Sequence, residues 1–265
     1  MKSISELKAI LSKSLAWNKA RLDCFVKMLF ALFVVKTVNL REIAVALSDS
    51  SQIDSRYKRV KRFFSKFQWD QDPFAIWLYR LFFHDEKVYL TIDRTNWFWG
   101  KAKINILTLG IAYEGIAIPI LWQCLPKAGN ASGKEHAAII QRFVRLFGKT
   151  HIEGILADRE FANRTLFAYL TQEELPFYIR IKNGAKASLF GEKGQRVDSA
   201  FKTLAIKEQT QYIQPMIIHG QKLWISAGRS ERGELLIVAS NRSSQHAVSV
   251  YLRRWEIETL FHSLK

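Results

Sequence analysis

The C-terminal end of the sequence carries four side chains of types that bind phosphate groups or metal ions. They are Tyr251, Arg254, Glu258 and Lys265. On a single helix over residues 244–265, these four would lie within a sector of about 60°, because each residue turns a helix by about 100°. Ile257, Leu260 and Leu264 would lie on the other side, where a helix packs on a core. A solvated charged face is the alternative interpretation for any one pair four residues apart, but the four together predict an active-site helix.

Two aspartates at the ends of apolar segments could act with this helix. Asp93 ends the segment 88–93, and Asp158 ends the segment 152–158. A carboxylate there is costly unless it is solvated, paired or bound to a cation, and for one aspartate alone a helix cap or turn is the alternative. Three convergent carboxylates, counting Glu258, repel one another unless hard cations such as Mg²⁺ neutralise them. They therefore predict a two-metal site for phosphodiester chemistry, in which one ion activates the attacking hydroxyl or water and the other stabilises the leaving oxygen.

The region between the aspartates and the helix must position these carboxylates. Its pattern predicts strands at 88–93, 104–111, 115–125, 152–158 and 177–181, and helices at 133–148 and 163–172. Ser132 and Glu135 form a capping-box pattern at the start of the first helix. The order β-β-β-α-β-α-β predicts a mixed α/β (α+β) fold, in which an antiparallel meander leads into crossover units.

Residue spacing and composition divide the chain into four regions. Residues 1–85 have helical spacing and little glycine, which predicts a basic helical region. Residues 86–183 hold the first part of the α/β core. Glycines separate short strand-like pieces in residues 184–243, which predicts a β-rich insertion subdomain. Residues 244–265 return to the core as its C-terminal helix.

The overall charge favours a polyanionic partner. The 265 residues include 40 Lys plus Arg against 24 Asp plus Glu, a formal net charge of +16, which indicates nucleic acid first. The longest apolar run, residues 28–35, is far shorter than the ~20 residues that a membrane span requires, and residues 1–6 lack the pattern of a signal peptide. We therefore expect a cytoplasmic, nucleoid-associated protein that needs no membrane. Cys24 and Cys124 lie in apolar segments and predict reduced core thiols rather than a disulfide or a zinc site.

One segment of the helical region, residues 56–66, contains basic side chains and no acidic one. On a helix, four of its basic residues share a side: Lys58, Arg59, Arg62 and Lys66. A solvated charged face over a core would explain this pattern without any ligand. Because the whole chain is basic, we favour contact with the phosphates of DNA.

Three segments around the carboxylates resemble the motifs of a known family. They are Ile92–Trp97 around Asp93, Ala157–Phe161 around Asp158, and Tyr251–Lys265 around Glu258. They resemble the DDE transposases of bacterial insertion sequences whose hallmark is a Tyr-Arg-Glu-Lys signature, the insertion-sequence-four family. The resemblance implies a ribonuclease-H-like core with a β-rich insertion between the second aspartate and the glutamate. It also implies that Asp93, Asp158 and Glu258 bind two Mg²⁺ or Mn²⁺ ions, with no small-molecule cofactor.

The activity that the resemblance implies is nicking at the terminal inverted repeats of a transposon, followed by attack of the freed 3′-hydroxyl on target DNA, in a homodimeric synaptic complex. Tyr251, Arg254 and Lys265 would hold DNA phosphates near the cut. Trp224 could stack on a flipped base, as a tryptophan of the insertion does in some relatives, or it could be a core residue.

Other interpretations remain open at the level of sequence. Members of this family usually continue past the signature lysine, so the resemblance indicates a truncated copy. The alternative function is a truncated, catalytically inactive DNA-binding relative that competes at transposon ends. A ribonuclease-H-like nuclease of another kind and a basic α/β domain with scattered acids are two further alternatives. Arg94, Asn96, Arg159 and Glu160 flank the aspartates and are expected to support them.

Overall fold

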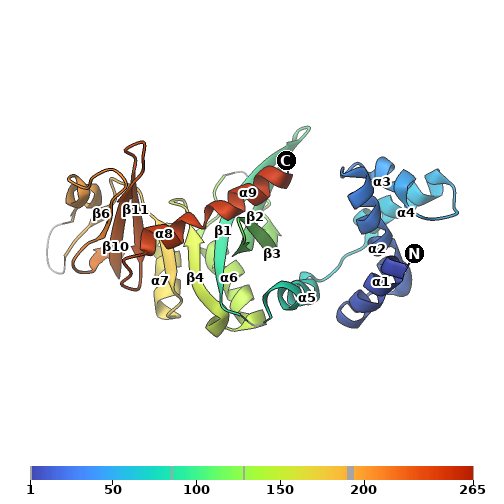
Figure 1. The fold of residues 1–265 in the computed structure, drawn as a ribbon, viewed down its shortest axis with the longest axis horizontal. Helices are drawn as coiled ribbons and strands as arrows, with labels where there is room; N and C mark the ends of the chain where they lie inside the picture. Colours follow the sequence, from blue (N-terminus) through green and yellow to red (C-terminus); the bar gives the residue numbers. More distant parts are fainter. Residues whose placement is uncertain (1, 85, 128, 190–193, 265) are drawn as a thin grey trace. The chain divides into compact units, whose positions relative to one another are not determined.

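The computed structural model describes residues 2–84, 86–127, 129–189 and 194–264, and the chain folds as two compact units (Figure 1). The first unit ends at Leu78 and the second begins at Tyr79. Both units contain helices, but only the second contains the sheet that carries the predicted carboxylates.

The first unit is helical. Its helices are α1 (Lys2–Ser14), α2 (Lys19–Val35), α3 (Leu40–Ala46), α4 (Ile53–Lys66) and the start of α5 (Gln71–Phe83). The Asn18 side chain accepts a hydrogen bond from the Arg21 amide and so caps the first turn of α2. Buried Cys24, Met28 and Val60 form part of the core that joins α2, α3 and α4. No helix in the described ranges is both long and apolar enough to cross a membrane.

The second unit is built on one mixed sheet. Its strands are β1 (Val88–Trp99), β2 (Ala102–Tyr113), β3 (Ile116–Cys124), β4 (Ile152–Ala157), β5 (Phe177–Arg180), β8 (Gln209–Gln211), β9 (Met216–Ile218), β10 (Gln221–Arg229) and β11 (Leu235–Ser240). The order is β3-β2-β1-β4-β5-β11-β10-β8, with β9 paired to β10. The first three strands are antiparallel, whereas β1, β4 and β5 run parallel. With the helices between them, these five strands form the expected ribonuclease-H-like core.

The helices between the strands begin as the sequence predicts. In α6 (Gly133–Phe147), the Ser132 hydroxyl accepts from the Glu135 amide and the Glu135 carboxylate accepts from the Ser132 amide, which is the predicted capping box. The next helix, α7 (Arg164–Gln172), is capped by Asn163, whose side chain accepts from the Leu166 amide. The η1 turn (Lys149–His151) leads from α6 into β4.

The glycine-rich segment continues the core sheet. β11 pairs with the edge of β5, and β10 and β8 extend the sheet beyond it. The remaining elements of this segment are β6 (Lys186–Ala187), β7 (Gln195–Arg196), which pairs with β6, and η2 (Val197–Phe201). The segment is joined to the core through β11, which shares backbone hydrogen bonds with β5, while β10 pairs with β11 and not with a core strand.

The single C-terminal helix predicted over 244–265 is wrong. The chain forms two helices, α8 (Ala247–Leu252) and α9 (Trp255–Leu264), which cross the sheet one after the other (Figure 1). At the junction, backbone hydrogen bonds span three residues instead of four, from Arg254 to Tyr251 and from Ile257 to Arg254. This tighter turn changes the direction of the side chains that follow. Leu264, expected in the core, is therefore 56% exposed, and Phe261 is buried against β3 beside Leu260 and Ile257.

The two cysteines also differ from each other. Cys24 is buried, as predicted, whereas Cys124 lies at the exposed end of β3 and is not a core residue. Both are free thiols.

Candidate active site

Asp93 and Asp158 lie at the same edge of the parallel part of the sheet. The pairing of β1 with β4 ends at Ile92 and Ala157, and the two aspartates are the next residues on each strand. Neighbouring strands are about 4.8 Å apart, so this register places the two carboxylates side by side. The sequence prediction that the first strand ends at Asp93 is wrong, because β1 continues to Trp99 while paired with β2 alone.

Arg254 links the carboxylates through a buried guanidinium. The residue is 3% exposed, and its Nη1 lies 3.5 Å from Asp93 Oδ2, while its Nη2 lies 2.5 Å from Glu258 Oε1. Its Nε donates to the hydroxyl of buried Tyr251 at 3.1 Å, and that hydroxyl makes a long hydrogen bond of 3.5 Å to Asp158 Oδ1. The three predicted catalytic acids, Tyr251 and Arg254 thus form one connected network.

Burial dominates the electrostatics of Asp93. It raises the pKa of this carboxyl from 3.8 to about 6; the neighbouring acids Glu160 and Asp158 raise it further, whereas the Arg94 amide and Arg254 oppose the shift. Burial also raises the pKa of the Tyr251 hydroxyl. For Arg254, burial disfavours the charged form, but Tyr251, Glu258 and Asp93 outweigh it and raise the pKa. Arg254 therefore stays positively charged between the acids of this site.

The donor chemistry suits a hard divalent ion, but the carboxylates are not gathered around one point. Among the described residues, no three Asp, Glu, His or Cys side chains are close enough together to hold a metal ion. Asp93 and Glu258 instead share the guanidinium of Arg254. A metal ion bound by both acids would compete with this guanidinium for Asp93 Oδ2 and Glu258 Oε1.

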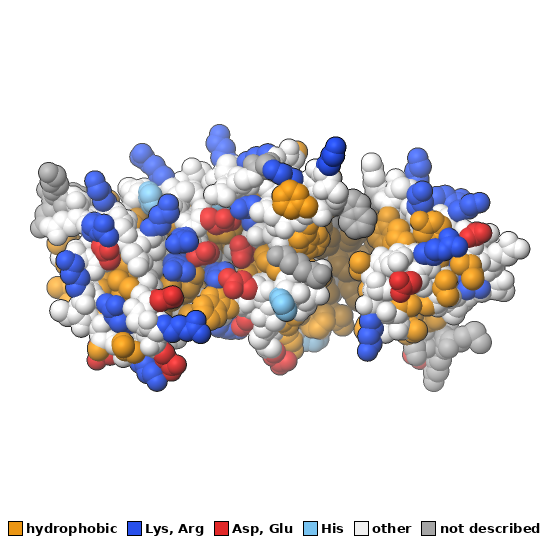
Figure 2. Space-filling view, turned by 90° about the horizontal axis from the view of Figure 1, so that it is seen from above, with side chains coloured by type: hydrophobic (Ala, Val, Ile, Leu, Met, Phe, Trp, Pro, Cys, Tyr) orange, Lys and Arg blue, Asp and Glu red, His pale blue; other side chains and the backbone are white. Residues whose placement is uncertain are grey.

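Arg180 is a neighbour of the site that the sequence does not single out. Its Nη1 lies 3.9 Å from Asp158 Oδ1, because β5 is paired in parallel with β4. The sequence did contain a signal for this neighbour. Arg180 is a basic residue at the end of the apolar strand β5, which follows the strand of Asp158 along the chain. Figure 2 shows acidic side chains grouped on one face of the unit that begins at Tyr79, with Lys and Arg side chains around them.

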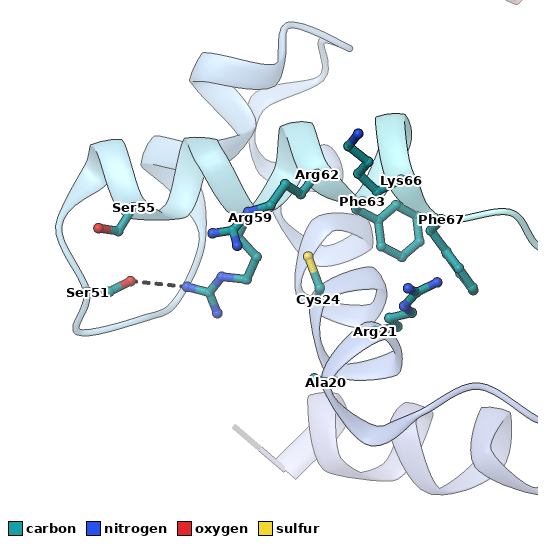
Figure 3. Close-up of a pocket in the computed structure, with 10 residues that line it drawn as sticks. All are labelled: Ala20, Arg21, Cys24, Ser51, Ser55, Arg59, Arg62, Phe63, Lys66 and Phe67. Carbon is teal, nitrogen blue, oxygen red and sulfur yellow. Dashed lines mark hydrogen bonds between the residues drawn. The ribbon is translucent and has the colours of Figure 1, made fainter.

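The basic segment predicted to contact DNA forms one wall of a pocket in the first unit (Figure 3). The pocket has a volume of about 540 Å³ and lies between α2 and α4, with Cys24 and Phe63 in its lining. Arg62 and Lys66 line it and are exposed. Arg21, which the sequence did not single out, also lines it and stacks over Phe67 at 4.2 Å.

The other two predicted DNA contacts of this segment, Arg59 and Lys58, are not exposed side chains of the pocket lining as Arg62 and Lys66 are. Arg59 lines the pocket but binds Asp49 at 2.7 Å and Ser51 at 3.1 Å, so it supports the turn before α4. This contact lowers the pKa of Asp49 to about 2. Lys58 is exposed and is not part of the pocket lining.

The last two predicted DNA contacts are Trp224, which is not part of the network of carboxylates described above, and Lys265. Trp224 is partly buried on β10 and lines a second hollow of about 570 Å³ with Tyr212 and Gln211. Lys265 lies outside the described residues.

The fold and the acids at its sheet edge define a ribonuclease-H-like protein with carboxylates at the end of its parallel strands. The chain belongs to the transposase DDE domain family, whose model matches residues 90–265. Members of this family generally use divalent metal ions. None of the curated proteins matches the sequence. Among solved structures, the chain is similar to a piggyBac transposase in a synaptic complex with hairpin DNA, with 13% identity and a TM-score of 0.46. The match covers 89% of this chain and 58% of that one, so the chain spans less than two thirds of its structural relative.

Proposed function

We propose that this protein is a DNA transposase of the insertion-sequence-four type, which nicks transposon ends and transfers them to target DNA. The observation that carries the proposal is the register of β1 and β4, which sets Asp93 beside Asp158 in a chain of the DDE family, with Glu258 connected to both through Arg254 and Tyr251. This arrangement gives a reason for three acids to lie in and around a partly buried site.

Asp93, Asp158 and Glu258 would hold two Mg²⁺ or Mn²⁺ ions. When bound, such ions supply an activated water or hydroxyl and neutralise the charge that develops on the leaving oxygen. Arg254 would move from between Asp93 and Glu258 to a DNA phosphate, which its planar guanidinium can bind with two parallel hydrogen bonds. Tyr251 and Lys265 would complete the phosphate contacts near the cut.

The first unit would bind the transposon end. Lys58, Arg62 and Lys66 are exposed and can reach phosphates, whereas Arg59 would act by holding the turn at Asp49. Trp224 would stack on a base that leaves the duplex. Terminal repeats and target DNA are the proposed partners, bound by a homodimer within the nucleoid.

Cleavage of supercoiled DNA that carries the cognate ends tests this function. With Mg²⁺ or Mn²⁺, the wild-type protein should nick the ends, and Glu258→Gln should leave the DNA intact. Glu153→Gln, which makes the same chemical change at an exposed position of β4, should cut at the wild-type rate. Equal nicking by the wild type and Glu258→Gln would overturn the proposed role of the carboxylate.

A second candidate is a DNA-binding relative that does not cut. The buried position of Arg254 between Asp93 and Glu258 favours it, because a protein that never binds metal ions can keep this contact permanently. Binding of the ends without cleavage, lost on charge reversal at Arg62 and Lys66, would support this candidate. Cleavage without preference for the ends would instead indicate a nuclease of another kind.

A further inference from the structure

Arg94, the residue after Asp93, makes more side-chain contacts than a solvent-facing arginine needs. Its side chain is 10% exposed. Nη1 donates to Asn96 Oδ1 at 2.8 Å and to Asn105 Oδ1 at 3.3 Å. Nη2 donates to Asn130 Oδ1 at 3.0 Å and to Glu160 Oε2 at 3.4 Å. One guanidinium therefore joins β1, β2, the loop before α6 and the turn after β4.

The partners of Arg94 are themselves fixed. Asn105 is buried, and its Nδ2 donates to the carbonyl oxygens of Lys127 and Gly129, both at 3.0 Å. These bonds hold the backbone at Lys127 and Gly129, just before Asn130, whose side chain accepts from Arg94. On the other side, Glu160 belongs to a turn in which the Phe161 amide donates to the Asp158 carbonyl at 2.9 Å. The contact between Arg94 and Glu160 therefore links the paired strands β1 and β2 to the turn that carries Asp158.

This link occurs where the sheet no longer supplies one. In the described residues, the ladder between β1 and β4 ends at Ile92 and Ala157, just before the two aspartates. Beyond that point, β1 is held by β2 alone, and the backbone after Asp158 turns away. A side-chain contact must then set the separation of the two carboxylates, and Arg94 with Glu160 makes one.

The charges of the pair suit this position. Glu160 adds a further carboxylate two residues after Asp158, and its Oε2 lies 3.4 Å from Arg94 Nη2. The guanidinium of Arg94 balances that added charge. A lysine could not do the same, because a single ammonium group lacks the planar fork that reaches acceptors on four segments. Glu160 Oε1 and Arg94 Nε are buried and have no hydrogen-bond partner among the described residues, so the contacts of the pair are made through Glu160 Oε2 and the two terminal nitrogens of Arg94.

We propose that Arg94 and Glu160 form a positioning pair that fixes the separation of Asp93 and Asp158 beyond the end of the β1–β4 ladder. The proposal rests on the proposed function in one respect, since it takes these two aspartates to be the metal ligands. Neither residue of the pair is proposed to touch the metal ions or the DNA.

Hydrogen exchange of the full-length protein tests the pair without any catalysis. Arg94→Met should speed exchange of the Phe161 amide about tenfold, the change expected when a charged hydrogen bond worth about 1.5 kcal/mol is lost. Glu160→Gln should have a smaller effect in the same direction, and the double variant should exchange no faster than Arg94→Met. Arg232→Met, which removes an exposed arginine from the turn between β10 and β11, should leave Phe161 unchanged. Unchanged exchange in Arg94→Met, or additive effects in the double variant, would overturn the proposal.

Binding of Mn²⁺ in the absence of DNA, followed by electron paramagnetic resonance, provides the functional measurement. Arg94→Met should weaken Mn²⁺ binding about 10- to 100-fold, as is typical when a group that orients metal ligands is removed. Arg94→Lys should recover only part of that loss. If the wild type binds Mn²⁺ but does not cut transposon ends, the proposed function fails while the pair stands on these measurements. If the wild type cuts and Arg94→Met binds Mn²⁺ and cuts as well as the wild type, the pair has no positioning role.

Discussion

Asp93→Asn should stabilise the metal-free protein at neutral and alkaline pH. The pKa of Asp93 is raised from 3.8 to about 6, mainly by burial. The folded protein therefore keeps this proton at pH values where the unfolded chain has lost it, and the free energy of unfolding falls as the pH rises from about 4 to about 6. A difference of one in pKa between the folded and the unfolded protein corresponds to about 1.4 kcal/mol. Above pH 6, the ionised carboxylate of Asp93 therefore lowers the free energy of unfolding by about 3 kcal/mol. Asparagine has the shape of the protonated acid and avoids this cost.

The assay is urea unfolding of the wild type and Asp93→Asn between pH 4 and pH 8, in buffer with a chelator. The two proteins should be equally stable near pH 4, and the variant should be more stable by about 3 kcal/mol at pH 8. Asp49→Asn is the matched control, because its contact with Arg59 lowers the pKa of Asp49 to about 2. That variant should lose stability at pH 8 rather than gain it.

Divalent ions should reverse the order of the two proteins. Mg²⁺ favours the ionised carboxylate, so it should stabilise the wild type and have little effect on Asp93→Asn. A variant that is less stable than the wild type at pH 8 without Mg²⁺ would refute the reasoning, because the contact with Arg254 would then outweigh the cost of burial. A difference that does not change with pH would refute it equally.

Three further predictions concern the helices beside the site. Ser132→Ala should lower the free energy of unfolding by about 1 kcal/mol in urea titrations, because the Glu135 amide loses its cap, and Ser132→Asp should recover most of it. Gly133→Ala should cost about 1 to 3 kcal/mol, since an added Cβ would lie 2.8 Å from the Thr165 Cβ; a variant as stable as the wild type would show that α6 and α7 can separate freely. His136 is 1% exposed and burial lowers its pKa from 6.5 to about 4, so NMR of the ring nitrogens should show a neutral ring at pH 5, and its contribution to stability should fall as the pH drops from about 6.5 to about 4.

The helices and strands whose formation depends on residues close together in the sequence could be predicted. The capping box at Ser132 and Glu135 lies within four residues, and it defined the start of α6. The apolar runs of β4 and β5 are short and bounded by polar residues, so their existence was clear from the pattern. The placement of Asp158 at the end of an apolar strand followed from the same local information.

What the sequence could not show depends on residues far apart in the chain. The break between α8 and α9 turns Arg254 toward Asp93, which lies 161 residues earlier, and no helical periodicity contains that contact. The continuation of β1 past Asp93 depends on its pairing with β2, because the pairing of β1 with β4 ends at Ile92. The ion pair between Arg59 and Asp49 could not be predicted either. A row of basic side chains on one side of a helix does not show which of them already bind an acid elsewhere in the chain.

The pairing of β5 with β11 has a consequence for any attempt to shorten this protein. Removing residues 184–243 would leave β5, whose first three residues are buried, with one row of amide and carbonyl groups open to solvent. Such an apolar edge recruits strands from other chains. A trimmed protein would therefore tend to aggregate through the strand next to the one that leads to Asp158. We therefore expect that the segment protects the core from self-association, because β11 covers the edge of β5.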